Sequence, residues 1–207
     1  MNRIIHIAYD NTDKKLGHYF ERCATEVKKV AVLRGLNCVL IDSNGLDVKT
    51  INNHTANADK YIFVAFSHGA PDALWGQKEH YIKAGNNLKN FYNSFLYTFA
   101  CKSAICFSPE LDSASIPCYC GYIDNAWASV HPQLENFFVQ CAVKGIISFL
   151  QGKSTADSMR DLIEEYNCQI KETQKIYGKI NPISAALLKN KQALRIIVYN
   201  KAMTIFD

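Results

Sequence analysis

Short apolar runs alternate with longer amphipathic stretches along most of the chain. The runs that we expect to form strands are residues 4–9, 38–41, 61–66, 95–99, 116–123 and 194–199. The stretches with an apolar residue at every third or fourth position, which predict helices, are residues 16–30, 48–58, 134–149, 159–177 and a shorter one after Pro182. Strands that alternate with helices predict an α/β fold. We expect a mostly parallel sheet with about six strands and helices on both faces, in three layers.

The whole chain, residues 1–207, is predicted to form a single domain. It has no internal repeat, low-complexity tract or linker, and 48% of its residues are hydrophobic, which is enough for a substantial core. Residues 61–66 are apolar on both faces, which is typical of a central parallel strand. Residues 202–206 are expected to extend the last strand or to pair with it.

Charge and cysteine content exclude several classes of protein. The net charge is only +4 and the basic residues are scattered, so we expect no nucleic-acid binding. No segment has the length of a membrane span or of a signal peptide. The eight cysteines follow no disulfide framework, and the closely spaced Cys118 and Cys120 have no matching pair of zinc ligands. We therefore expect reduced thiols, a cytoplasmic location, and no metal or organic cofactor.

A histidine and a cysteine follow two of the expected central strands. His68 comes directly after the strand at residues 61–66, and Cys101 follows the strand at residues 95–99. In an open parallel sheet, functional residues gather beyond the carboxyl ends of the strands. Either residue alone is more often a packing or surface residue. If the two strands are neighbours, however, a thiol and an imidazole emerge side by side, and we predict Cys101 as nucleophile and His68 as its general base.

This pair of side chains suits acyl transfer. An ordinary thiol, with a pKa near ~8.5, is only slightly ionised at neutral pH, and an adjacent imidazole can take its proton. Negative charge that develops on the carbonyl oxygen then needs fixed donors. The backbone N–H groups of Gly69 and Cys101 are the predicted donors, and Gly69 has no Cβ to obstruct the substrate.

The two blocks resemble a known family. Residues 61–69 read as a strand followed by His-Gly, and residues 95–103 read as a strand followed by Ala-Cys-Lys-Ser. This pattern resembles the caspase–gingipain–separase superfamily of cysteine peptidases and is most similar to its CHAT- and separase-like members. The order of elements resembles a single complete caspase-like domain. The Gln-Ala-Cys-x-Gly signature of true caspases is absent, so aspartate specificity is not implied.

The resemblance implies a cysteine endopeptidase that forms a thioester acyl-enzyme with a Cys-His dyad, acting on protein or peptide substrates. In separase-like relatives an acidic residue after the fifth strand selects basic side chains. Asp124 occupies the corresponding place, with Trp127 as an apolar wall, which implies cleavage after Arg or Lys. The alternative is that Asp124 caps a turn and Trp127 is core. No third residue that orients His68 can be named. A regulatory protein partner or self-cleavage at Lys78, Lys83 or Lys89 is the expected route of activation.

Two other classes of protein compete with this interpretation. The first is a caspase-fold interaction module that is catalytically silent or acts only within a complex. The second is a flavodoxin-like nucleotide-binding domain, which the sequence disfavours because no glycine-rich phosphate loop follows a strand.

Overall fold

A six-stranded sheet forms the centre of the molecule. A computed structural model describes residues 4–55 and 61–207, and the strand order is β2-β1-β3-β7-β8-β9. The strands are β1 (Ile4–Tyr9), β2 (Cys38–Ile41), β3 (Tyr61–Phe66), β7 (Phe95–Phe99), β8 (Cys118–Tyr122) and β9 (Leu194–Val198). All neighbouring pairs are parallel except β8 and β9, which are antiparallel. The predicted α/β fold with a mostly parallel sheet of six strands is confirmed.

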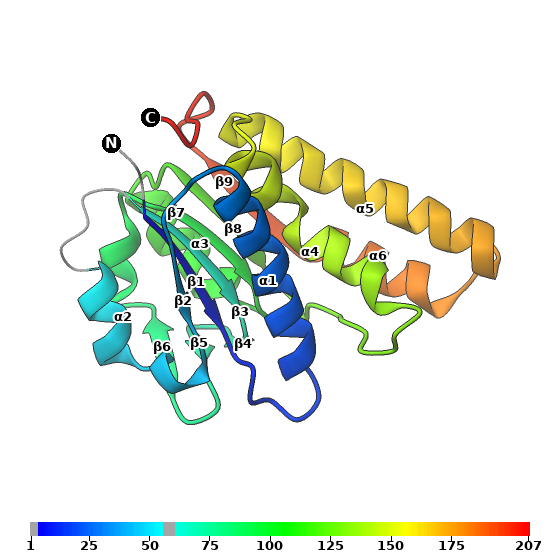
Figure 1. Cartoon of the computed structure of the whole chain (residues 1–207), viewed down its shortest axis with the longest axis horizontal. Coiled ribbons are helices and arrows are strands. Elements are labelled where there is room, and N and C mark those ends of the chain that lie inside the picture. Colours follow the sequence, from blue (N-terminus) through cyan, green and yellow to red (C-terminus); the bar gives the residue numbers. More distant parts are fainter. Residues whose placement is uncertain (1–3, 56–60) are drawn as a thin grey trace.

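Helices cover both faces of this sheet (Figure 1). They are α1 (Gly17–Leu33), α2 (Val48–Thr55), α3 (Ala104–Ser113), α4 (Glu135–Leu150), α5 (Thr155–Tyr177) and α6 (Pro182–Ala193). Helices α1, α4 and α5 pack on one face, and α3 packs on the other. Single turns of 3₁₀ helix lie at Ser43–Gly45 and Leu88–Phe91. The expected three layers are therefore present.

The central strand β3 supplies both halves of the core. Ile62, Val64 and Phe66 belong to the apolar cluster beneath α1 and α4, whereas Phe63 and Ala65 belong to the cluster on the opposite face. Successive side chains of a strand point to opposite faces, so a strand between two helical layers has to be apolar throughout. This explains why β3 has a continuous apolar run instead of an alternating pattern.

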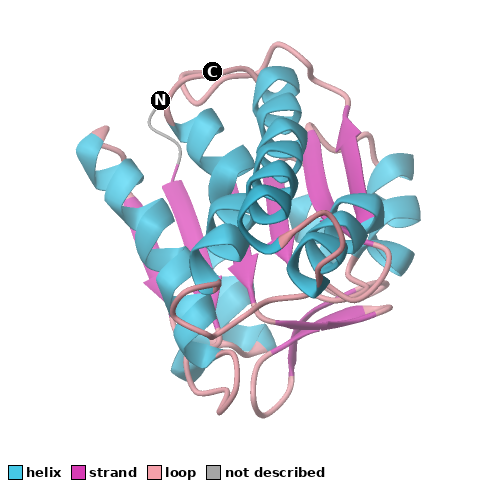
Figure 2. Ribbon diagram, turned by 90° about the vertical axis from the view of Figure 1, so that its right-hand side faces the viewer, coloured by secondary structure: helices cyan, strands magenta, loops and turns pink. Residues whose placement is uncertain are grey.

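A second, small sheet lies near the carboxyl ends of the central strands. It consists of β4 (His68–Ala70), β5 (Ala73–Trp75) and β6 (His80–Lys83), which pair antiparallel. Figure 2 shows this sheet across the lower end of the main one. Because β4 begins at His68, directly after β3 and Ser67, the small sheet fixes the direction in which the chain leaves the central sheet at that histidine.

Three details differ from the expectations. Helix α3 was not predicted, because Pro109 stands inside it and proline normally interrupts a helix. Residues 202–206 form no strand; they turn back over the start of α5, where the Met203 carbonyl accepts a hydrogen bond from the Thr155 N–H (2.9 Å). Strand β8 is shorter than the strand expected at residues 116–123. The end of the helix expected at residues 48–58 lies outside the described residues.

The buried His6 on β1 makes the fold sensitive to acid. The residue is 3% exposed, and neither ring nitrogen has a hydrogen-bond partner among the described residues. The rings of His54 and Tyr61 lie at centroid distances of 5.2 and 5.7 Å. Burial, and secondarily the neighbouring His54, lower the pKa of His6 from 6.5 to about 4. The unfolded chain therefore binds this proton more readily than the folded chain. The stability that neutral His6 provides is complete above pH 6.5 and is lost as the pH falls towards 4.

We expect His6→Leu to remove this part of the pH dependence. Between pH 7 and pH 4.5 the wild-type free energy of unfolding should decrease by about 2 kcal/mol more than that of the variant. Urea unfolding at the two pH values measures the difference. The exposed His131, replaced by Gln, serves as a control that keeps the wild-type dependence. Equal pH dependence in His6→Leu and wild type would contradict this assignment.

Candidate active site

Strands β3 and β7 bring His68 and Cys101 to the same edge of the sheet. The two strands are adjacent and parallel, with Phe66 opposite Phe99, and the Ser67 N–H donates to the Phe99 carbonyl at 3.3 Å. His68 and Cys101 each stand two positions beyond this last matched pair. The expectation that the two strands are neighbours is confirmed, and the histidine and the cysteine start from corresponding positions.

The backbone at Gly69 is packed directly against the turn that contains Cys101. A Cβ at position 69 would lie 2.2 Å from the carbonyl oxygen of Cys101 and 3.0 Å from the Cβ of Ala100. Real side chains do not approach a backbone oxygen so closely, so only glycine fits here. The two residues whose N–H groups were predicted to hold an oxyanion are thus in backbone contact.

We therefore expect Gly69→Ala to separate the His68 turn from the Cys101 turn. The methyl group has to displace one backbone segment, and misplacement of reacting groups by about 1 Å can cost about 100-fold in rate. Hydrolysis of a fluorogenic peptide, with circular dichroism to verify folding, measures the effect. Gly85→Ala is the control, since no atom lies within 4 Å of a Cβ built there, although its φ of +68° adds local strain. Wild-type activity in Gly69→Ala would contradict the proposed arrangement.

Cys101 is half-buried and lies in a tight turn between β7 and α3. Its sulfur accepts a hydrogen bond from the Ala126 N–H at 3.4 Å. The next residue, Lys102, has a left-handed φ of 58°, and its N–H donates to the Asp124 carbonyl at 3.0 Å. A non-glycine residue in this region carries strain, so the surrounding contacts hold the turn in place.

The serine of the Ala-Cys-Lys-Ser block supports this turn from inside. Ser103 is completely buried, its hydroxyl donates to the Ala100 carbonyl at 3.0 Å, and it accepts from the Tyr122 N–H at 3.3 Å. It therefore ties Ala100, the residue before Cys101, to the end of β8. The role of Ser103 is to position backbone, which explains why a small hydroxyl residue follows the cysteine.

His68 has a carboxylate partner that the sequence did not reveal. Its Nε2 lies 3.1 Å from Oδ2 of Asp13, in the loop between β1 and α1, and its ring packs edge-on against Phe20 with the centroids 5.5 Å apart. The other oxygen of Asp13, Oδ1, accepts from the N–H groups of Lys15 and Leu16 at 2.9 and 2.5 Å. Those two hydrogen bonds fix the carboxylate independently of the histidine.

Several interactions keep Asp13 ionised. Partial burial acts to raise the pKa of Asp13, but hydrogen bonds from the Leu16 and Lys15 N–H groups, together with the His68 contact, outweigh it and lower the pKa below 3.8. An ionised carboxylate accepts a hydrogen bond from Nε2–H, which places the proton of neutral His68 on that nitrogen. Nδ1 then has a free lone pair that can accept a proton.

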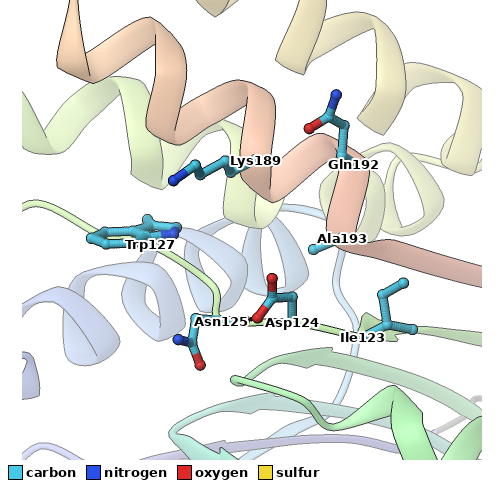
Figure 3. Close-up of a pocket in the computed structure, with 7 residues that line it drawn as sticks. All are labelled: Ile123, Asp124, Asn125, Trp127, Lys189, Gln192 and Ala193. Carbon is cyan, nitrogen blue, oxygen red and sulfur yellow. Dashed lines mark hydrogen bonds between the residues drawn. The ribbon is translucent and has the colours of Figure 1, made fainter.

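Asp124 and Trp127 line a hollow next to the turn that contains Cys101. The hollow has a volume of about 380 Å³, and its other walls are Ile123, Asn125, Lys189, Gln192 and Ala193. Figure 3 shows the Asp124 carboxylate directed into it between Trp127 and Ala193. Trp127 is 49% exposed, so it is not a core residue. The structure thus brings both residues to one pocket. Asp124 also has a role in the turn, because its Oδ1 accepts a hydrogen bond from the Asn125 N–H at 2.7 Å.

A lysine in the same pocket was not predicted. The Nζ atom of Lys189, on α6, lies 5.6 Å from the centre of the Trp127 ring, in the geometry of a cation–π contact (Figure 3). It reaches the pocket only because α6 passes over the loop that follows β8. A positive charge of the protein itself therefore already lies over the aromatic wall of this pocket.

In the part of the chain that the structure describes, no group of three or more His, Cys, Asp or Glu side chains is placed to hold a metal ion. Within the same residues, no helix combines the length and apolar character needed to cross a membrane.

The fold of this chain is similar to the caspase-like fold of one solved structure. Gingipain R, described as an Arg-specific cysteine proteinase, aligns with a TM-score of 0.61 over 98% of this chain at 8% sequence identity. The chain spans about half of the gingipain chain (47%). No family model matches the sequence, and no curated protein is similar to it. At this identity the similarity shows the fold alone.

Proposed function

We propose that the protein is a cysteine endopeptidase with Cys101 as nucleophile and His68 as general base. The observation that carries this proposal is the convergence at one sheet edge of a half-buried thiol, an imidazole and an ionised carboxylate that contacts the imidazole. A histidine oriented by a carboxylate next to a thiol is the arrangement that acyl transfer requires. The fold of gingipain R, a cysteine proteinase, supports the same reaction class.

The proposed reaction proceeds in two halves. Nδ1 of His68 takes the proton of the Cys101 thiol, and the sulfur forms a bond to the peptide carbonyl carbon. The N–H groups of Gly69 and Cys101 hold the oxygen that becomes negative, and Asp13 stabilises the imidazolium. The C–N bond then breaks as His68 returns the proton to the leaving amine. Water, activated by the same imidazole, hydrolyses the thioester and restores the thiol.

We further propose that the pocket at Asp124 and Trp127 receives the side chain before the cleaved bond. A guanidinium or ammonium group entering there would pair with the Asp124 carboxylate and displace Lys189 from the Trp127 ring. The Arg specificity stated for gingipain R agrees with a basic side chain in this position. On the basis of the sequence, we also propose a cytoplasmic location and activation by a partner protein or by self-cleavage.

Peptide-library profiling tests this specificity. We expect Arg and Lys to dominate the P1 position. Asp124→Asn should lower kcat/KM for P1 Arg by about 10- to 100-fold through loss of a charge-assisted hydrogen bond. Lys189→Met should raise it several-fold, because the internal competitor is gone. Lys191→Met is the matched control on the same helix, since its ammonium instead bonds Asn167 at 2.7 Å. A preference for Asp or apolar P1 residues would contradict basic specificity.

The competing proposal is a caspase-fold interaction module without catalysis. Nothing in the geometry of Asp13 favours it: a binding module does not require a carboxylate that contacts the histidine. Complete absence of peptide cleavage by the wild-type protein, with or without candidate partners, would favour this alternative.

A further inference from the structure

One buried side chain holds the loop that contacts the nucleophile. Asn190, on α6, is 1% exposed, and both ends of its amide bond the backbone of a single residue. Its Oδ1 accepts from the Trp127 N–H at 2.7 Å, and its Nδ2 donates to the Trp127 carbonyl at 2.7 Å. An asparagine that satisfies both backbone groups of one residue fixes the position of that residue whatever its side chain.

The same loop is attached to the Cys101 turn at its other end. The Asp124 carbonyl accepts from the Lys102 N–H at 3.0 Å, and the Ala126 N–H donates to the Cys101 sulfur at 3.4 Å. Residues 124–127, which we call the bridging loop, thus connect the thiol to α6. Because Ala126 directly precedes Trp127, a shift of Trp127 changes the direction of the Ala126 N–H.

The Ala126 N–H is a hydrogen-bond donor to the Cys101 sulfur. A hydrogen bond to the charged form of a group stabilises that form, and backbone N–H donors are among the groups that promote thiolates. The neutral S–H can donate to the Ala126 carbonyl at 3.7 Å, which favours the protonated form, but this contact is longer. Ionisation therefore exchanges a weak contact for a charge-assisted one.

We propose that Asn190 is a positioning residue for Cys101: by fixing Trp127, it keeps the Ala126 N–H directed at the sulfur and so maintains the thiolate. The inference rests on the proposed role of Cys101 as nucleophile. Through Trp127 and Ala126, α6, an element distant in sequence from both His68 and Cys101, would then affect the reactivity of the thiol.

The test is the pH dependence of Cys101 alkylation. Iodoacetamide is applied to the whole protein between pH 5 and pH 10, and mass spectrometry of the peptide that contains Cys101 gives the rate. Asn190→Ala should move the midpoint upward by about one pH unit, which corresponds to about tenfold slower alkylation below the midpoint. Ala126→Pro removes the N–H itself while Asn190 stays in place, and it should produce the same upward shift of the midpoint. It therefore also tests the proposal if Asn190→Ala fails to fold.

Asn181→Ala is the matched control. Asn181 is the buried N-cap residue that precedes α6; it is 8% exposed, and its side chain accepts from the Ser184 N–H at 2.8 Å and donates to the Gly178 carbonyl at 2.7 Å. Its loss should lower Tm, as the loss of Asn190 does, because both variants leave buried backbone groups unpaired. It does not contact the bridging loop, so the alkylation midpoint should stay at the wild-type value.

The outcomes separate this inference from the proposed function. A wild-type midpoint in both Asn190→Ala and Ala126→Pro would overturn the role of Asn190, while peptide cleavage by the wild type would leave the endopeptidase intact. An equal shift in Asn181→Ala would also overturn it, because general loosening of α6 would then explain the effect. A shift confined to Asn190→Ala and Ala126→Pro, in a protein that cleaves no peptide, would support the positioning role and contradict the endopeptidase.

Discussion

Peptide hydrolysis falls by about 10⁴-fold or more when Cys101 is replaced by Ala, because removal of the nucleophile removes the covalent pathway. Only the sulfur is lost, from a half-buried position, so the fold should be retained. The rate of cleavage of a peptide chosen from the library, measured for purified wild-type and variant proteins, checks this expectation.

Cys106→Ala is the matched control for this variant. Cys106 has intermediate exposure and lies on α3, one turn beyond the nucleophile. Its thiol has no role in the proposed reaction, and its replacement should leave kcat/KM close to the wild-type value. Substantial activity in Cys101→Ala, or loss of activity only in Cys106→Ala, would show that Cys101 is not the nucleophile.

Asp13→Asn is expected to have the second-largest effect. The two carboxylate oxygens have separate partners: Oδ1 bonds the N–H groups of Lys15 and Leu16, whereas Oδ2 contacts Nε2 of His68. Asparagine keeps an oxygen for the backbone but presents an NH₂ group to the histidine. Nε2 must then act as an acceptor, which puts the proton on the nitrogen that should receive it from Cys101. We expect kcat to fall by about 10²- to 10⁴-fold with little change in KM.

Asp13→Ala separates orientation of the histidine from support of the loop. It removes both sets of contacts, so its kcat should fall as in Asp13→Asn, and its free energy of unfolding should fall by about 1 kcal/mol more, from loss of the backbone hydrogen bonds. Steady-state kinetics and urea unfolding provide the two readouts. Wild-type kcat in Asp13→Asn would show that His68 works without the carboxylate.

The local pattern of the sequence was sufficient for the central sheet. Strands β3 and β7 are buried at every position and consist mainly of apolar residues, so both were recognised, and their ends place His68 and Cys101 at one edge of the sheet. Helix α3 was missed for an equally local reason. Pro109 has no N–H and normally marks the end of a helix, and only tertiary packing of Phe107 and Leu111 overrides that preference.

The residues that complete the site were missed because their contacts are long-range. Asp13 precedes a helix, where a carboxylate commonly bonds free N–H groups, and its sequence context indicates only that role. Its second oxygen meets His68 because β1 and β3 are adjacent in the sheet. Lys189 and Asn190 reach the site from α6, and no periodicity in the sequence indicates which loop α6 crosses.

Labelling by a peptidyl electrophile tests the central claim most directly. The wild-type protein is treated at pH 7 with a chloromethyl ketone peptide that carries Arg at P1, digested and analysed by mass spectrometry. We predict one adduct per chain, on Cys101 alone among the eight cysteines, and strongly reduced labelling in Asp13→Asn. Modification of another cysteine in preference to Cys101, or no modification at all, would contradict the account.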